Sequence, residues 1–306
     1  MSEECLRVAV STRALFNLEY ENQIFVQEGS ESYVQYQMKH EKEILKKGAA
    51  FSLVEALLRL NGGQTSRRTE IMIMSKNSAD VSLRIFHSIE SYGLDITRAA
   101  FTTGQSIVPY VKAFGCDLYL STNEADVAEA TREQIAAGLI MTDAYSDVTP
   151  IKQIRIAFDG DAVLFSDEAE QIFQLEGVKA FEESERQKAS EPLAEGPFAH
   201  FLKMIAAIQR EYPGESVPIR TALVTARSAP AHERVIRTLR YWGVRVDEAF
   251  FMGGEDKSAM VLAFGAHIFF DDNKEYIKKA SKLVLSAHVV YPTKDILGAR
   301  QAQMVC

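Results

Sequence analysis

The chain has 306 residues, of which 47% are hydrophobic and 25% charged, the balance of an ordinary globular protein. This length is enough for two domains of about 100–200 residues each. The net charge of −8 argues against a protein that binds the nucleic-acid backbone, because such proteins have a basic surface. Small phosphorylated substrates stay open, because a bound cation can reverse the local field.

Three further features bear on where the chain works. No apolar run approaches the roughly 18 residues of a membrane span. The N-terminus lacks the basic and apolar stretches of a secretory signal. The cysteines are odd in number, far apart and without metal-ligand spacing, which favours reduced thiols (Cys5, Cys116 and Cys306). We therefore predict a cytoplasmic protein that binds neither membrane nor nucleic acid.

The first element in chain order is an apolar strand at Leu6–Val10, and a similar strand returns at Ile154–Phe158. A shift of 148 places brings Val10-Ser11-Thr12-Arg13-Ala14 onto Phe158-Asp159-Gly160-Asp161-Ala162. After a slip of two residues, Ala113-Phe114-Gly115 falls on Ala263-Phe264-Gly265. A register held over about 110 residues indicates two homologous halves, 1–150 and 151–306.

Each half continues in the same order. A polar insertion follows the first strand; in the second half it spans about 166–212 and ends in an amphipathic helix. A second strand comes next, at Ile71–Met74 or Thr221–Val224, and then a helix, which Ser228 would N-cap in the second half. A third unit ends on the apolar run His267–Phe270.

This alternation predicts an α/β protein with parallel sheets covered by helices on both faces. In such sheets ligands bind beyond the carboxyl ends of the strands. The second half places polar residues there: Asp159, Gly160 and Asp161 after one strand, Thr225, Ala226, Arg227 and Ser228 after the next, Lys257 before a helix, and Asp271 and Asp272 after the last strand.

Carboxylates gathered at one rim repel each other unless a cation holds them, and oxygen ligands suit magnesium. We therefore predict a Mg²⁺ site formed by four aspartates (Asp159, Asp161, Asp271 and Asp272). For phosphate, we predict binding by Gly160, Thr225, Ala226, Arg227, Ser228 and Lys257, with backbone N–H groups at the helix start. For Arg227, a salt bridge at the start of the helix is an equal alternative.

The catalytic roles follow from the chemistry of phosphate esters. Asp159 can attack phosphorus and form an aspartyl-phosphate. Asp161 can protonate the leaving oxygen and later deprotonate water, since Gly160 permits a tight turn between the two carboxylates. Lys257 and magnesium neutralise the phosphoryl oxygens, and Thr225 hydrogen-bonds to them.

This order of motifs resembles the haloacid dehalogenase superfamily. Four stretches are similar to the cytosolic 5′-nucleotidase type I family: Phe158–Asp167, Pro192–Pro197, Thr225–Ala229 and Phe269–Asp272. The likeness extends into the first half through Val10–Phe16. The resemblance implies two tandem Rossmann-like halves and magnesium-dependent hydrolysis of nucleoside 5′-monophosphates, with AMP as the most prominent substrate.

In register, the first half has lost this chemistry. Ser11 stands for the nucleophile, Arg13 for the acid/base, Ile107 for the lysine and Ser121-Thr122 for the metal carboxylates. Its role is therefore structural packing or, alternatively, nucleotide binding, in which Arg13 would hold a phosphate bidentately.

Two insertion features have simpler interpretations. The charge run Glu182–Arg186 is expected to be a solvated helix face. Of the rings Phe173, Phe181, Phe198 and Phe201, helical spacing places most in the core and leaves at most one to stack on a base.

Two other functions stay open. One is a phosphatase for a different small phosphate ester, because the motifs define the reaction but not the leaving group. The other is a non-catalytic, nucleotide-binding regulatory protein. A nucleotide effector and an oligomeric assembly are compatible with the sequence.

Overall fold

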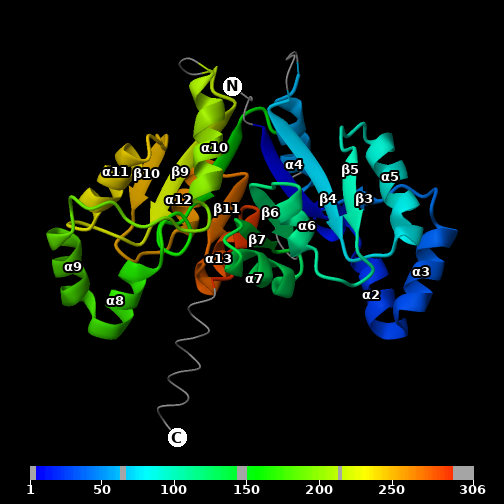
Figure 1. Cartoon of the computed structure of the whole chain (residues 1–306), viewed down its shortest axis with the longest axis horizontal. Helices are drawn as coiled ribbons and strands as arrows, with labels where there is room; N and C mark the ends of the chain where they lie inside the picture. Colours follow the sequence, from blue (N-terminus) through cyan, green and yellow to red (C-terminus); the bar gives the residue numbers. More distant parts are fainter. Residues whose placement is uncertain (1–4, 63–66, 143–149, 213–215, 292–306) are drawn as a thin grey trace, which may run out of the picture.

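The computed structural model describes residues 5–62, 67–142, 150–212 and 216–291. They form an α/β fold around one mostly parallel sheet of ten strands (Figure 1). The strands are β1 (Leu6–Ser11), β4 (Thr69–Ser75), β5 (Arg98–Phe101), β6 (Leu118–Ser121), β7 (Ala137–Ile140), β8 (Ile154–Phe158), β9 (Ile219–Thr225), β10 (Glu248–Phe251), β11 (Ile268–Asp271) and β12 (Ser286–His288). A separate small ribbon pairs β2 (Phe16–Asn17) with β3 (Lys46–Lys47).

The helices alternate with these strands. In the first part of the chain they are α1 (Thr12–Leu15), α2 (Glu19–Glu28), α3 (Ser30–Lys39), α4 (Phe51–Arg59), α5 (Ser82–Ser91), α6 (Val108–Ala113) and α7 (Glu124–Arg132), with a short 3₁₀ turn at Ala79–Val81. In the second part they are α8 (Glu168–Glu176), α9 (Val178–Gln187), α10 (Ala199–Arg210), α11 (His232–Tyr241), α12 (Ser258–Phe264) and α13 (Lys274–Ala280).

The sheet is continuous across the middle of the molecule. Its strand order is β10-β9-β8-β11-β12-β7-β6-β1-β4-β5. All neighbours are parallel except β12 and β7, which pair antiparallel with Ala287 opposite Ile140. The sequence led us to expect parallel sheets within separate halves, and the structure instead joins all ten strands through this β7–β12 seam.

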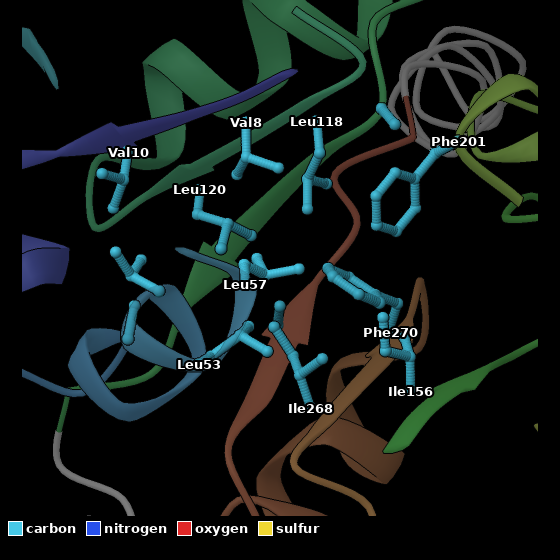
Figure 2. Close-up of a cluster of buried hydrophobic side chains, with 14 of the residues drawn as sticks. Val8, Val10, Leu53, Leu57, Leu118, Leu120, Ile156, Phe201, Ile268 and Phe270 are labelled. Atoms are coloured by element: carbon cyan, nitrogen blue, oxygen red, sulfur yellow. The ribbon is translucent and has the colours of Figure 1, made fainter. Parts of the chain in front are cut away.

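The hydrophobic core differs between the two faces of the sheet. On one face, a single cluster runs across the seam under α4, α5, α10 and α11. Figure 2 labels Leu53 and Leu57 of α4 together with Ile156 of β8 and Ile268 of β11 in this cluster, and α4 contacts β8, so a helix from the first part of the chain packs on the sheet of the second. On the other face, α6 and α7 cover one cluster, and α12 and α13 cover another. The shared cluster makes the sheet one packing unit.

Asparagine caps set the helix starts at two equivalent strand ends. Asn123 Oδ1 accepts the backbone N–H of Asp126 at the start of α7, and Asn273 Oδ1 accepts that of Glu275 at the start of α13. The predicted cap at Ser228 is wrong. α11 begins at His232 with Ala231 at the N-cap position, and the residues between β9 and the helix form a turn around the buried Arg227.

The predicted insertion contains three helices with different surroundings. α8 and α9 form a hairpin at the lower left of Figure 1, and α2 and α3 form one at the lower right. α10 returns to the sheet, where Phe198 and Phe201 are fully buried in the core. Phe173 is half-exposed and Phe181 meets it edge-on.

Within the described residues, no helix is both long and apolar enough to span a bilayer. Cys5 and Cys116 are free thiols, and Cys306 lies outside the described residues.

The seam leaves no room for a side chain at Gly138 in β7. A Cβ there would lie 2.8 Å from Cβ of Ala287 in β12 and 3.0 Å from a ring carbon of Phe270 in β11. We expect Gly138→Ala to lower the free energy of unfolding by about 1–3 kcal/mol, because overpacking forces neighbours to shift. Urea denaturation measures this loss.

Ala287→Gly in the Gly138→Ala background should recover part of that loss, since it removes the nearest obstructing atom. The two single variants and the double variant form a thermodynamic cycle. Purely additive losses would contradict a shared space at the seam.

Candidate active site

The predicted polar residues meet at the carboxyl ends of three adjacent strands. Asp159 directly follows β8, while Thr225 and Asp271 are the last residues of β9 and β11. The backbone N–H of Asp159 donates to the Phe270 carbonyl at 2.8 Å, which ties the β8 end to β11. Since β8 lies between β9 and β11 in the sheet, the topology gathers residues that are far apart in the sequence.

Lys257 is the cation at the centre of this rim. Its Nζ lies 2.7 Å from Asp159 Oδ1 and 2.8 Å from Asp271 Oδ2, and the side chain is only 1% exposed. Burial alone would lower the pKa of Lys257, but the two carboxylates raise it above its ordinary value. The ammonium therefore stays charged, and it bridges two strand ends.

Three buried carboxylates surround this lysine. Oxygens of Asp159, Asp271 and Asp272 all lie within 4.8 Å of one another. Burial raises the pKa of Asp159; Lys257 opposes this effect and Asp272 adds to it. Burial likewise raises the pKa of Asp271, with Lys257 opposing and Asp159 adding. The ionised group carries three negative charges against one positive charge, so the donor set and the charge fit one divalent cation.

Asp271 and Asp272 have different surroundings. Both carboxylate oxygens of Asp271 already accept hydrogen bonds: Oδ2 from Lys257 and Oδ1 from the Asn273 backbone N–H at 2.7 Å. Asp271 is also completely buried, whereas Asp272 is 8% exposed. Asp272 is therefore better placed than Asp271 to contact an ion that enters from solvent.

Asp161, the fourth predicted metal ligand, is outside this group of three. Its carboxylate accepts two hydrogen bonds from Arg227, from Nε at 2.8 Å and from Nη2 at 2.7 Å. Arg227 also donates to Glu185 of α9. Of our two interpretations of Arg227, the structure shows the ion pair, although its partners come from the Asp161 loop and from α9 rather than from the start of a helix.

The loop that contains Asp159 and Asp161 is tight for a different reason than expected. Gly160 does not adopt a positive φ; instead Ala162 does, with φ of 60°. A Cβ at Gly160 would lie 3.1 Å from Thr225 Oγ1, so close approach of this buried threonine favours glycine. Of the other predicted phosphate-binding residues, Ala226 and Ser228 are exposed at the rim.

The sequence analysis did not identify two charged residues that lie next to Arg227, namely Glu185 and Arg234. Glu185 was expected on a solvated face, but it is 1% exposed and binds both Arg227 and Arg234. The sequence contained one signal, because Glu185 lies one helical turn after Phe181 and the two side chains therefore share a helix face. In the structure the Arg227 guanidinium lies 5.6 Å from the centre of the Phe181 ring on that face.

The corresponding rim of the first part of the chain holds no comparable carboxylate cluster among the described residues. Ser11 caps α1 by accepting the Ala14 N–H, Ile107 is buried, and Arg13 pairs with Glu19 at 2.8 Å. Beside Arg13 lies a cavity of about 810 Å³, which is also lined by Lys76 and Ser78.

Comparison with known proteins gives two findings. The family model described as 5′-nucleotidase matches residues 1–295. Human "Cytosolic 5'-nucleotidase 1B" is 38% identical over 292 residues, which cover 92% of this chain and 48% of that protein. The chain thus spans about half the length of the curated relative it matches. No solved structure gives a significant match.

The raised pKa values predict how a divalent cation stabilises the fold. Without the cation, the folded state keeps protons on Asp159 and Asp271 that the unfolded chain releases above about pH 4. Stability from these groups is therefore lost as the pH rises towards neutrality. A divalent cation held by this group would bind its deprotonated form, so the stabilising effect of added magnesium should be larger near pH 7 than near pH 5.

Thermal unfolding at both pH values, with and without magnesium, measures this effect. Asp272→Asn should reduce the magnesium shift. Asp117→Asn, at a carboxylate that binds the Arg7 N–H and His200 elsewhere, should leave it unchanged. A magnesium shift of equal size at the two pH values would contradict the assignment.

Proposed function

The chain belongs to the 5′-nucleotidase family, and we propose that it hydrolyses nucleoside 5′-monophosphates to nucleoside and phosphate, with AMP as preferred substrate. The observation that carries this proposal is the buried group of Asp159, Lys257, Asp271 and Asp272 at adjacent strand ends. A nucleophilic carboxylate beside a buried ammonium is suited to attack a phosphate dianion, because the cation offsets the repulsion between them.

Two steps complete the reaction. Asp159 forms a bond to phosphorus while the bond to the 5′ oxygen breaks, and Asp161 donates a proton to the departing alkoxide. Asp161 then accepts a proton from water, whose oxygen attacks the aspartyl-phosphate and releases inorganic phosphate. Lys257 stays protonated throughout and neutralises charge on Asp159 and on the transferred phosphoryl group.

We propose Mg²⁺ as the cofactor. Asp159 and Asp272 would hold it through carboxylate oxygens, while Asp271 orients Lys257. When bound, the ion would neutralise charge on the phosphoryl oxygens. We assign binding of the same oxygens to Thr225, at the end of β9, and to the backbone N–H groups near Ala226 and Ser228, which are exposed at the rim.

We further propose that the chain consists of two tandem haloacid dehalogenase-like halves, 1–150 and 151–306, of which the first is degenerate. The strand order supports this, since β7-β6-β1-β4-β5 and β12-β11-β8-β9-β10 run outwards from the seam in matching chain order. The paired caps Asn123 and Asn273, 150 residues apart, also support it. The "cytosolic" name of the relative supports a cytoplasmic location.

A specific observation favours a second role for the first half, as a site for a nucleotide effector. The cavity beside Arg13 is lined by Arg13 and Lys76, which pair with Glu19 and Asp126, and by the aromatic rings of Phe25 and Tyr33. Two acidic side chains, Glu31 and Asp80, also line it. Ser78 Oγ is buried there without a hydrogen-bond partner among the described residues. Cations and a hydroxyl suit phosphate, and the rings suit a base.

The nucleophile assignment predicts the effect of one substitution. Asp159→Asn should lower turnover by at least about 1000-fold, equivalent to about 4 kcal/mol of barrier, because an amide cannot attack phosphorus. The measurement is phosphate release from AMP with magnesium present. Asp117→Asn, which alters a largely buried carboxylate away from this rim, should retain activity. Turnover of Asp159→Asn within about tenfold of the wild type would exclude the covalent mechanism.

The effector assignment predicts a second binding site. In an Asp159→Asn background, calorimetric titration of nucleotide should give two sites per chain. Arg13→Ala should weaken one of them roughly tenfold or more, since a charge-assisted contact contributes about 1.5–3 kcal/mol. Lys112→Ala, which removes an exposed ion pair with Glu133 outside the cavity, should weaken neither. A single site that Arg13→Ala does not affect would leave the first half as scaffold.

A further inference from the structure

A buried chain of ion pairs connects the α8–α9 hairpin to Asp161. Arg227 donates to Asp161 with Nε and Nη2 and to Glu185 with Nη1. Glu185 in turn accepts from Arg234 Nη1 of α11 at 2.7 Å. The side chains of Arg227, Glu185 and Arg234 are no more than 4% exposed, whereas Asp161, at the end of the chain of ion pairs, is 19% exposed.

The geometry of Arg227 makes this connection rigid. A guanidinium is planar, and Nε and Nη2, which form one edge of that plane, donate to Asp161. Nη1, outside that edge, donates to Glu185. The Phe181 ring of the same helix as Glu185 lies 5.6 Å from the guanidinium carbon. Two contacts from α9 therefore determine how Arg227 presents its fork to Asp161.

Stability alone is a weak explanation for this network. Desolvation can cancel the attraction within a buried ion pair, so such pairs often add little to stability. The segment that directly follows the hairpin has its own anchor on α11, because Arg234 Nε donates to the Glu191 carbonyl and Thr238 Oγ1 accepts the Leu193 N–H.

The α2–α3 hairpin gives an internal comparison. At the positions in register with Glu185, Arg234, Arg227 and Phe181 stand Gln37, Arg84, Asn77 and Tyr33. Gln37 accepts from Arg84 and donates to the Tyr33 hydroxyl at 3.0 Å, and Asn77 donates to the same hydroxyl at 3.1 Å. A neutral amide thus stands at the position of Glu185, while Glu21 of α2 supplies the carboxylate that pairs with Arg84. The glutamate and the arginine at 185 and 227 occur on the side where an aspartate stands at position 161.

We propose that Glu185 is a positioning residue for the proton transfer at Asp161, acting through Arg227. It fixes the guanidinium whose Nε and Nη2 hold both Asp161 oxygens, so the direction in which the Asp161 carboxyl faces depends on α9 lying against the rim. This inference rests on the proposed function, because it assumes that Asp161 protonates the departing alkoxide.

The test is a change in leaving-group dependence. Two substrates share every nucleoside contact: AMP, and its analogue with sulfur in place of the bridging 5′ oxygen. A thiolate is far less basic than an alkoxide, so it departs with less need of a proton. In Glu185→Gln, kcat/KM for AMP should fall at least about tenfold more than kcat/KM for the sulfur analogue. Glu185→Asp, which keeps the charge on a shorter side chain, should restore part of the ratio.

A matched control removes a comparable ion pair elsewhere. Glu21→Gln breaks the buried Glu21–Arg84 pair of the α2–α3 hairpin, at 2.8 Å, and should leave the ratio of the two kcat/KM values unchanged. Should Glu185→Gln fail to fold, Glu185→Asp provides the same test through the same ratio.

The outcomes separate the two proposals. Equal losses on both substrates would assign Glu185 a structural role and overturn this inference alone. A shift of the ratio in Glu21→Gln as large as that in Glu185→Gln would overturn it as well. A wild-type chain that hydrolyses neither substrate would overturn the proposed function, and this inference with it.

Discussion

The ammonium of Lys257 is the contact on which the acidic group at the strand ends depends. It lies between Asp159 and Asp271, which end neighbouring strands, and all three side chains are buried. Each isolated charge would cost several kcal/mol to bury. The lysine compensates one carboxylate and leaves the rest of the group negative, so the rim is stable as a fold and still attracts a cation. Lys257 therefore both stabilises the buried carboxylates and sets the net charge of the group.

The seam between β7 and β12 places a second constraint on the molecule. Because β12 is hydrogen-bonded to β11, and β11 carries Asp271, the strand that joins the two parts of the sheet also adjoins the candidate active site. The core cluster under α4 and α10 crosses this seam. The first part of the chain therefore buries apolar surface of the second, and this packing does not depend on any ligand. A role as scaffold and a role in binding a nucleotide are compatible.

The first and second parts of the chain share the same backbone arrangement at the strand ends but carry different charged residues there. Where Asp271 Oδ1 accepts the Asn273 N–H, Ser121 Oγ accepts the Asn123 N–H. Lys257 corresponds in register to the buried Ile107, and Lys76 of the first side forms its ion pair with Asp126 instead. Both parts of the chain keep the hydrogen bond that shapes the loop before the helix. Where the second part has the buried charges of Lys257 and Asp271, the first part has the uncharged residues Ile107 and Ser121. Backbone geometry at a strand end thus tolerates either set, and the charges determine which chemistry can occur there.

The sequence by itself determined the elements and the chemical inventory of the rim. Apolar runs predicted β8 with its observed bounds and β1, β4, β9 and β11 to within two residues, because buried strands need continuous apolar side chains. The parallel topology then predicted that Asp159, Lys257 and Asp271 would meet, as they do. The edge strands β5 and β10, the seam strands β7 and β12 and the inner strand β6 were not predicted. The pairing of β7 with β12 is a contact between distant segments that no local pattern encodes. For the same reason only the tertiary structure could show that Arg227 faces Asp161 and that Glu185, within a run of charged residues, is buried against two arginines. Local periodicity reports which face of a helix is apolar, but the partner of a buried charge depends on how separate elements pack.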